Sequence, residues 1–218
     1  MGYGVKVRVW GDYACFTRPE MKVERVSYDV LTPSAARGIL ENIYWKPAVR
    51  WLVDKIMVIK PIKFDNIRRN EVKDKMSVST SLIEKALKDD STVIYLDSNS
   101  NRAQRATMLL KDVEYIIEAH FELTDKAGAT DTAEKHYNIA LRRLRKGQCF
   151  SRPYLGCREF SAHFEIIEDH ELVESNYYGT EIDLGWMLWD IDFNDNCKPI
   201  FYRPKMINGE IEVPNLWR

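Results

Sequence analysis

Lys135 and His136 are the adjacent side chains whose types best suit catalysis in this sequence of 218 residues. An imidazole titrates near neutral pH, so His136 could accept or donate a proton during a reaction. A neighbouring ammonium could stabilise the negative charge of a pentavalent phosphorane. On a helix the two side chains point about 100° apart, so they can share one reactive centre only if the helix end faces it. The alternative is that His136 is a surface residue on an exposed helix.

RNA cleavage is a reaction that such groups could catalyse without a metal. A base removes the 2′ proton, a cation steadies the scissile phosphate, and an acid protonates the 5′-oxygen as it leaves. The products would be a 2′,3′-cyclic phosphate and a 5′-hydroxyl. Histidine, lysine and tyrosine side chains are sufficient for these steps, and no cofactor is required.

The other candidate groups have plainer interpretations. His120 and His163 fall within expected strands and are more simply structural, and His170 lies among acids on the surface. No paired-cysteine, phosphate-loop, zincin or nucleophile-elbow motif is present, so we expect no metal site. A group of carboxylates could bind Mg²⁺, although such acids more often edge an exposed sheet. These are Asp183, Asp190 and Asp192.

The near-neutral net charge of -1 hides two blocks of opposite sign. Residues 135–158 contain seven Lys or Arg and no acid, whereas residues 165–195 contain ten acids and no Lys or Arg. A basic block is suited to binding phosphate groups. The alternative, which charge alone does not exclude, is that both blocks are solvated faces that partly neutralise each other.

A first amphipathic helix should position one tyrosine. Thr32 can cap it, and Pro33 suits the first helical position. Its apolar positions follow 3.6-residue spacing as far as Ile43. Pro47 stops the helix, because the residue before a proline avoids the helical region. Tyr44 is therefore expected in the last turn.

A second amphipathic helix should carry Lys135 and His136 near its start. Asp131 can cap it, since Glu134 follows at the spacing of a capping box. Gly147 ends it, directly after cations that complement the dipole of the helix.

Alternating residues predict the strands. Residues 5–10 alternate strictly, so one face of this strand should be buried and the other basic. Asn208 and Gly209 predict a tight hairpin, and Arg102 and Arg105 are expected in a loop. Further strands are expected at residues 50–59, 92–96, 113–123, 158–167, 184–193, 200–206 and 210–213, with a short helix at 81–88 and a basic loop or hairpin arm at 66–75.

This order of elements predicts an α+β fold. Residues 1–180 would form a ferredoxin-like, RRM-type β-α-β-β-α-β domain, a fold often used for RNA, and residues 181–218 a small C-terminal antiparallel β-sheet. No apolar run approaches the roughly 18 residues of a membrane span, and the first residues lack the features of a secretory signal. A cytoplasmic protein with no membrane contact is expected.

Motifs in consistent order along nearly the whole chain resemble the subtype-d branch of the CRISPR-associated "five" family, a subunit of the type I-C (Dvulg) Cascade complex. No single motif is diagnostic, but their combination is specific. They are WGDYACF (10–16), IYWKP (43–47), NIRRNEV (66–72), LKDV (110–113), EAHF (118–121), KH (135–136), RKGQCF (145–150), PYLGCREF (153–160), DLGWML (183–188) and DIDF (190–193).

The resemblance implies a metal-independent endoribonuclease that cuts precursor CRISPR RNA at the 3′ base of the repeat hairpin. The catalytic tyrosine, lysine and histidine of the family correspond to Tyr44, Lys135 and His136. We hypothesise that His136 is the general base or acid, that Lys135 stabilises the phosphate, and that Tyr44 orients or donates a proton. Because a free tyrosine has a pKa near 10, Tyr44 as the base would need strong activation.

The resemblance also implies partners. After cutting, the chain would remain on the 5′ handle of the crRNA and join the backbone and large subunits of Cascade, with a possible contact to double-stranded DNA. Phe16, Trp45 and Tyr154 could stack bases, although each is at least as suited to the core. The cations expected to contact RNA are Arg68, Arg69, Arg142, Arg143, Arg145, Lys146, Arg152 and Arg158.

Two other function classes stay open on the sequence. A non-catalytic RNA-binding subunit could cap the 5′ handle, as relatives outside the subtype do. A metal-dependent nuclease that acts on DNA is a weaker alternative, and sensitivity to a chelator would separate it from a metal-independent ribonuclease.

Overall fold

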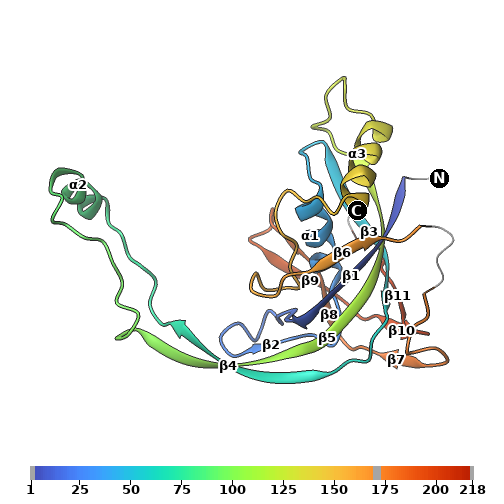
Figure 1. The fold of residues 1–218 in the computed structure, drawn as a ribbon, viewed down its shortest axis with the longest axis horizontal. Helices are drawn as coiled ribbons and strands as arrows, with labels where there is room; N and C mark the ends of the chain where they lie inside the picture. Colours follow the sequence, from blue (N-terminus) through green and yellow to red (C-terminus); the bar gives the residue numbers. More distant parts are fainter. Residues whose placement is uncertain (1–2, 169–172, 217–218) are drawn as a thin grey trace. The chain divides into compact units, whose positions relative to one another are not determined.

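A computed structural model describes residues 3–168 and 173–216 of the chain. In this range the fold is a mixed α/β one, with a large antiparallel sheet and three helices (Figure 1). The chain divides into two compact units, one of residues 1–65 and 108–218 and one of residues 66–107. None of the helices in the described ranges is long and apolar enough to cross a membrane.

The large sheet provides the framework of the first unit. Strand β5 (Arg102–Leu123) pairs with β1 (Gly4–Ala14) on one side and with β3 (Val49–Val58) on the other. The short strand β2 (Arg25–Val26) and the longer β4 (Phe64–Val72) also pair with β5. The full path is β6 (His163–Ile166), β1, β5, β3, β11 (Glu210–Glu212), β10 (Lys205–Ile207) and β7 (Glu181–Asp183).

The core of the first unit follows from the sequence pattern. Val5, Val7 and Val9 alternate along β1 and are buried, as the alternation predicts. Helix α1 (Pro33–Ile43) begins after Thr32, whose side chain accepts from the backbone N–H of Ala35, so this predicted cap is confirmed. Its apolar face packs on β3 and on β8 (Met187–Asp192).

Helix α3 (Ala133–Arg145) has a different cap from the expected one. The Thr132 hydroxyl accepts from the Lys135 backbone N–H at 3.2 Å, which is the capping position. Asp131 as the cap was therefore wrong, because it lies one residue outside the helix, where its carboxylate is available to side chains. Gly147, at φ +61°, follows the end of the helix as predicted.

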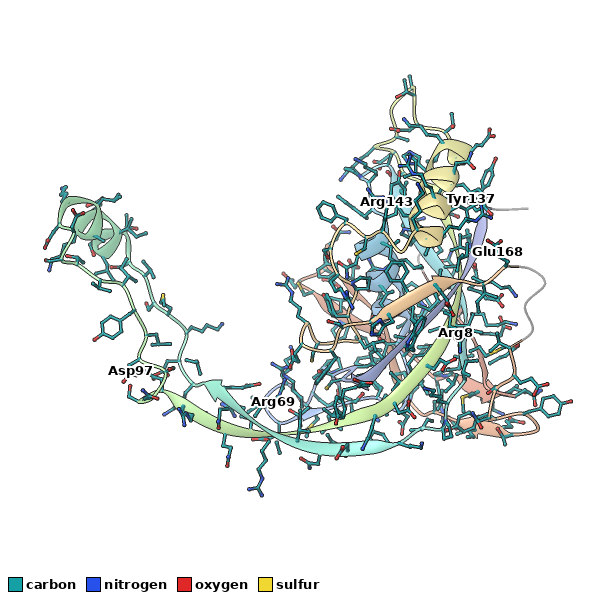
Figure 2. The ribbon with its side chains drawn as sticks, viewed as in Figure 1. Arg8, Arg69, Asp97, Tyr137, Arg143 and Glu168 are labelled. Carbon is teal, nitrogen blue, oxygen red and sulfur yellow. The ribbon has the colours of Figure 1, made fainter. Side chains whose placement is uncertain are left out.

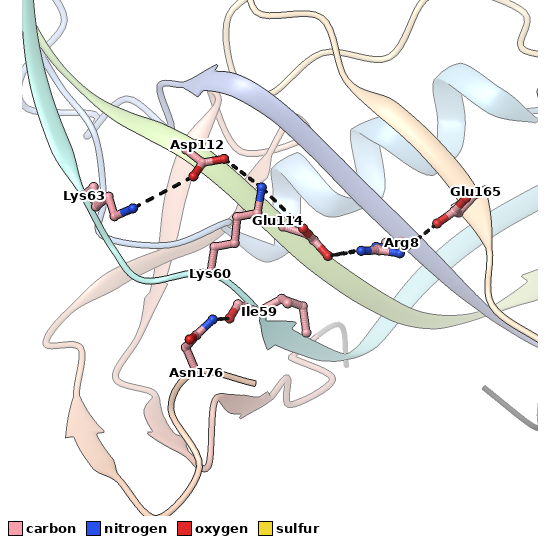
Figure 3. A network of polar contacts seen from close by, with 8 residues as sticks. All are labelled: Arg8, Ile59, Lys60, Lys63, Asp112, Glu114, Glu165 and Asn176. Atoms are coloured by element: carbon pink, nitrogen blue, oxygen red, sulfur yellow. Dashed lines mark hydrogen bonds and ion pairs between the residues drawn. The ribbon is translucent and has the colours of Figure 1, made fainter. Parts of the chain in front are cut away.

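The basic face of β1 is neutralised by acids on its neighbours. Arg8 donates from its Nε to Glu114 on β5 at 2.8 Å and from Nη1 to Glu165 on β6 at 3.1 Å (Figure 3). Lys60 extends the network, since its Nζ lies 2.7 Å from Asp112 and 3.5 Å from Glu114. These cations therefore join neighbouring parts of the sheet and are not an uncompensated positive surface.

The C-terminal residues extend the large sheet. Strand β11 pairs with β3, and β10 joins β11 to β7, while β8 and β9 (Lys198–Tyr202) form a separate two-stranded sheet. Asn208 and Gly209 both have positive φ angles, which confirms the predicted tight hairpin. The ferredoxin-like designation and the boundary between residues 180 and 181 stay predictions. Strands β7, β10 and β11, which follow that boundary, belong to the same sheet as β1, β3 and β5.

A buried ion pair connects the C-terminal part to α1. The guanidinium of Arg37 donates to both oxygens of Asp190, at 3.0 and 2.8 Å, and the Asp190 side chain is almost fully buried. A neighbouring acid of the same block, Asp183, pairs with Arg203 at the surface. Two of the carboxylates considered for Mg²⁺ are thus engaged by guanidinium groups.

We expect Asp190→Ala to destabilise the protein by about 2 kcal/mol, since it leaves the Arg37 charge partly buried with only Glu41 beside it. At roughly 2–4 °C per kcal/mol for a chain of this size, the melting temperature should fall by about 4–8 °C. Thermal unfolding measures the effect. Asp183→Ala, which breaks an exposed pair, is the matched control and should cost less than about 1 kcal/mol. Equal effects of the two variants would contradict the prediction.

The second unit consists of two extended segments of the chain with a helix between them. Its β4 runs beside the first part of β5 (Figure 1), and the backbone N–H of Lys73 donates to Asn101 O at 2.7 Å. Helix α2 (Thr80–Lys88) begins after Ser79 and buries none of its residues. The hairpin arm and this helix agree with the expectation.

Four expectations about strands are wrong. The single strand expected at residues 200–206 is divided between β9 and β10, which lie in different sheets. Residues 92–96 form no strand, because no neighbouring strand offers them hydrogen bonds in the second unit. Arg102 and Arg105 lie in β5, which begins eleven residues earlier than the predicted strand at 113–123 because β4 pairs with the added part. Residues 158–162 precede β6, which is shorter than expected.

Candidate active site

Tyr44 and His136 meet although they lie 92 residues apart in the sequence. The Tyr44 hydroxyl is 2.5 Å from His136 Nδ1. Tyr44 is the residue that ends α1, with extended φ and ψ angles of -148° and 117°, and its carbonyl accepts from the Trp51 indole at 2.8 Å. His136 lies in the first turns of α3 and is only 2% exposed, so the alternative of an exposed surface histidine is wrong.

Asp131 joins His136 to Lys135. Its Oδ1 lies 3.1 Å from His136 Nε2 and 3.4 Å from Lys135 Nζ, and its Oδ2 accepts from the backbone N–H of Gly128 at 3.0 Å. The hydrogen bond from Gly128 is the main cause that holds the pKa of Asp131 below its ordinary value, and Lys135 adds to it. An ionised carboxylate only accepts hydrogen bonds, so it selects the tautomer of His136 with the proton on Nε2.

The phenol of Tyr44 remains protonated at neutral pH. Burial is the largest cause that raises the pKa of Tyr44, whereas the charge of Arg143 acts in the opposite direction. When the imidazole is neutral, this tautomer leaves Nδ1 of His136 to accept from the Tyr44 O–H. A chain of two hydrogen bonds follows, from the phenol to the imidazole and from the imidazole to Asp131.

Arg143, which is labelled on α3 in Figure 2, contacts Tyr44 and the residue before it. Its Nη1 donates to Ile43 O at 2.7 Å, and its guanidinium carbon lies 5.2 Å from the centre of the Tyr44 ring. This contact makes Arg143 a positioning residue for Tyr44 in the structure.

The chain of hydrogen bonds lines an open cavity of about 450 Å³. Tyr44, Asp131, Lys135 and His136 all line it. Sequence reasoning missed three of the lining side chains: Asp131, which it assigned to the helix cap, and the lysines Lys46 and Lys126. Lys46 lies within the IYWKP motif that drew attention to Tyr44, so its position was the available signal.

The cations expected to bind RNA fall into two groups. Some are engaged within the chain, because Arg145 pairs with Glu168, Arg69 with Glu71, and Arg143 with the Ile43 carbonyl. The others are exposed and make no ion pair with the described residues. This second group is Arg68, Arg142, Lys146, Arg152 and Arg158.

The remaining sequence candidates lie away from the site. His120 contacts Asp54 at 2.8 Å and His163 stacks on Trp10, in agreement with structural roles, whereas His170 lies outside the described residues. Of the aromatic residues considered for base stacking, Phe16 is buried in the core, Tyr154 is half-buried, and Trp45 is 52% exposed. Trp45 is therefore the most accessible of the three.

Comparisons with known proteins agree with the motifs. A protein of Mannheimia succiniciproducens named CRISPR pre-crRNA endoribonuclease Cas5d is 52% identical over 223 residues, which cover 98% of this chain and 96% of that protein. A Thermus thermophilus protein of the same name is 39% identical over 229 residues, with 96% and 91% covered. A solved structure described as a CRISPR-associated protein has a TM-score of 0.71 and 27% identity over 97% of this chain and 91% of that chain.

The family model for Cas5d, described as CRISPR-associated protein (Cas_Cas5), matches residues 4–214. This match and the two close relatives span nearly the whole chain. The chain therefore belongs to the Cas5d family of CRISPR-associated proteins.

Proposed function

We propose that this chain is an endoribonuclease that cleaves precursor CRISPR RNA at the 3′ base of the repeat hairpin by attack of the 2′-hydroxyl. The observation that carries the proposal is the contact between the Tyr44 hydroxyl and His136 Nδ1 in a cavity that Lys135 also lines. The names of the two relatives, both pre-crRNA endoribonucleases, support the substrate class.

The hydrogen bonds of the site indicate how a proton would move. The 2′-hydroxyl gives its proton to the Tyr44 oxygen while the phenol proton passes to His136 Nδ1, so the phenol never carries a full negative charge. The imidazolium that forms is stabilised by the carboxylate of Asp131. The Lys135 ammonium neutralises the charge that develops on the phosphate and gives a proton to the 5′-oxygen as it leaves. Proton exchange with solvent then removes the proton from His136 and restores the one that Lys135 has lost. The products are a 2′,3′-cyclic phosphate and a 5′-hydroxyl, and no metal takes part in these steps.

The product stays bound in this proposal. The exposed cations at the end of α3 and after it, Arg142, Lys146, Arg152 and Arg158, suit contacts with the RNA backbone. The chain would hold the 5′ handle of the crRNA and join the backbone and large subunits of a type I-C Cascade complex, as membership of the family suggests.

Purified protein should cleave end-labelled repeat RNA in excess EDTA, and a 2′-deoxy sugar at the mapped cut site should abolish cleavage. The reason is that the nucleophile belongs to the substrate. Analysis of the product ends by polynucleotide kinase and acid treatment should detect the cyclic phosphate.

Two other outcomes would each replace the proposal. Tight hairpin binding without cleavage would favour the alternative of a non-catalytic subunit that caps the handle. Cleavage only after Mg²⁺ is added would favour a metal-dependent nuclease.

A further inference from the structure

We propose that Lys46 and Lys126 bind the phosphodiesters on either side of the scissile one, and this inference rests on the proposed function. The substrate class is therefore a single RNA strand that passes through the candidate active site, with its backbone held by the protein at two points. Lys135 acts on the scissile phosphate, which lies between these two phosphodiesters.

The two lysines come from two loops that are joined at the cavity. Lys46 follows α1 directly after Tyr44 and Trp45, and Lys126 lies in the loop that leads to α3. Thr124 connects these loops, because its hydroxyl donates to Pro47 O at 2.6 Å and its backbone N–H donates to Ala48 O at 3.0 Å. Each lysine is thus within two residues of a fixed junction, and both line the same cavity as Tyr44 and His136.

The charges of the cavity favour an anion. Three lysines line it, Lys46, Lys126 and Lys135, against a single carboxylate, Asp131. That carboxylate already accepts from Gly128, Lys135 and His136. Three ammonium charges minus one carboxylate charge leave an excess of two positive charges. The first turn of α3, which carries Lys135 and His136, adds to the positive potential.

Lys46 and Lys126 differ from most lysines of the first unit in their lack of an ion pair. Both are exposed and make no ion pair with the described residues. By contrast, four lysines on the large sheet or next to it are paired with acids within 3 Å. These are Lys6 with Glu118, Lys55 with Glu210, Lys60 with Asp112 and Lys205 with Glu181. Uncompensated ammonium groups beside a reactive site are the electrostatic feature that phosphate binding requires.

The first test is the salt dependence of RNA binding. The probe is the repeat RNA that the wild-type chain cleaves, with a 2′-deoxy sugar at the cut site so that it stays intact. Lys46→Gln and Lys126→Gln should each weaken binding roughly 3- to 10-fold near 0.1 M salt. Each should also lower the slope of log Kd against log salt by about 0.7–1, the value for one lost phosphate contact.

Lys22→Gln is the matched control, because Lys22 is also exposed, lies in a loop and makes no ion pair with the described residues. It should change neither the affinity nor the slope. Single-turnover rates at protein and RNA concentrations below Kd should fall for Lys46→Gln and Lys126→Gln in proportion to the loss of affinity, since these lysines bind flanking phosphates and not the scissile one.

A second test locates the phosphates. Single methylphosphonate linkages remove one charge at a time from the RNA next to the cut site. The loss of RNA affinity caused by Lys46→Gln should disappear when the linkage on one side of the cut site is neutral. The loss of affinity caused by Lys126→Gln should disappear when the linkage on the other side is neutral.

The outcomes separate this inference from the proposed function. Unchanged salt slopes for both variants would overturn the inference, and so would an equal change of the slope in Lys22→Gln. If the wild-type chain still cleaved the repeat RNA, the proposed function would be unaffected by either result. Losses that persist with every neutral linkage would also overturn it. A wild-type chain that cleaves no repeat RNA would instead contradict the proposed function, and the binding measurements would still decide the role of the lysines.

Discussion

His136→Gln should lower the single-turnover rate of RNA cleavage by about 10³-fold while the affinity for the repeat hairpin changes less than about 2-fold. The imidazole is the final acceptor of the 2′ proton in the proposed relay, and glutamine cannot take up a proton. Glutamine is preferred to alanine because His136 is buried, and its amide can still bond to the Tyr44 hydroxyl or to Asp131.

His120→Gln is the control for this variant. His120 also contacts an aspartate, Asp54, at 2.8 Å, but it lies in β5 away from the cavity. We expect His120→Gln to cleave at the wild-type rate. If His136→Gln also cleaved at the wild-type rate, the assignment of the general base would be wrong.

Asp131→Asn should lower the rate of cleavage by about 10²-fold without weakening RNA binding. Asparagine keeps the size of the side chain but can donate a hydrogen bond, so it no longer selects the tautomer with the proton on Nε2. The fraction of His136 that can accept the Tyr44 proton at Nδ1 then falls, and the imidazolium loses the negative charge that stabilises it.

Two measurements distinguish this positioning role from a general loss of structure. Nitrogen NMR shifts of the His136 ring should report a change of tautomer in Asp131→Asn, and Asp131→Glu should recover part of the rate. Glu134→Gln, a change of the same kind in the first turn of α3, should leave both the rate and the ring shifts unchanged. A wild-type tautomer in Asp131→Asn together with a normal rate would refute the role of Asp131.

Local chemistry made much of the fold predictable from the sequence. The Thr32 and Pro33 pair fixed the start of α1, and the alternation of Val5, Val7 and Val9 indicated the buried face of β1. These features depend on neighbours within one turn or one strand. The expected strand at residues 92–96 failed because a strand also needs a partner at its edge, which its own composition does not reveal.

The candidate site was less predictable, because its contacts join distant segments. The sequence pointed to Tyr44, Lys135 and His136 as separate candidates, but the burial of His136 depends on α1 packing beside α3. Asp131 looked like a cap because capping residues and active-site carboxylates are of the same type. The structure separates the two roles, because it shows that Thr132 caps α3 and that Asp131, one residue earlier, contacts His136.

The 92 residues between Tyr44 and His136 also set when a nascent chain could become active. A ribosome adds roughly 5–20 residues per second, so the segment that carries Tyr44 emerges several seconds before α3. During that interval the phenol has no imidazole partner. In the proposed relay, a chain still under synthesis therefore lacks the acceptor of the 2′ proton, and cleavage would begin only once translation of the last third of the chain is under way.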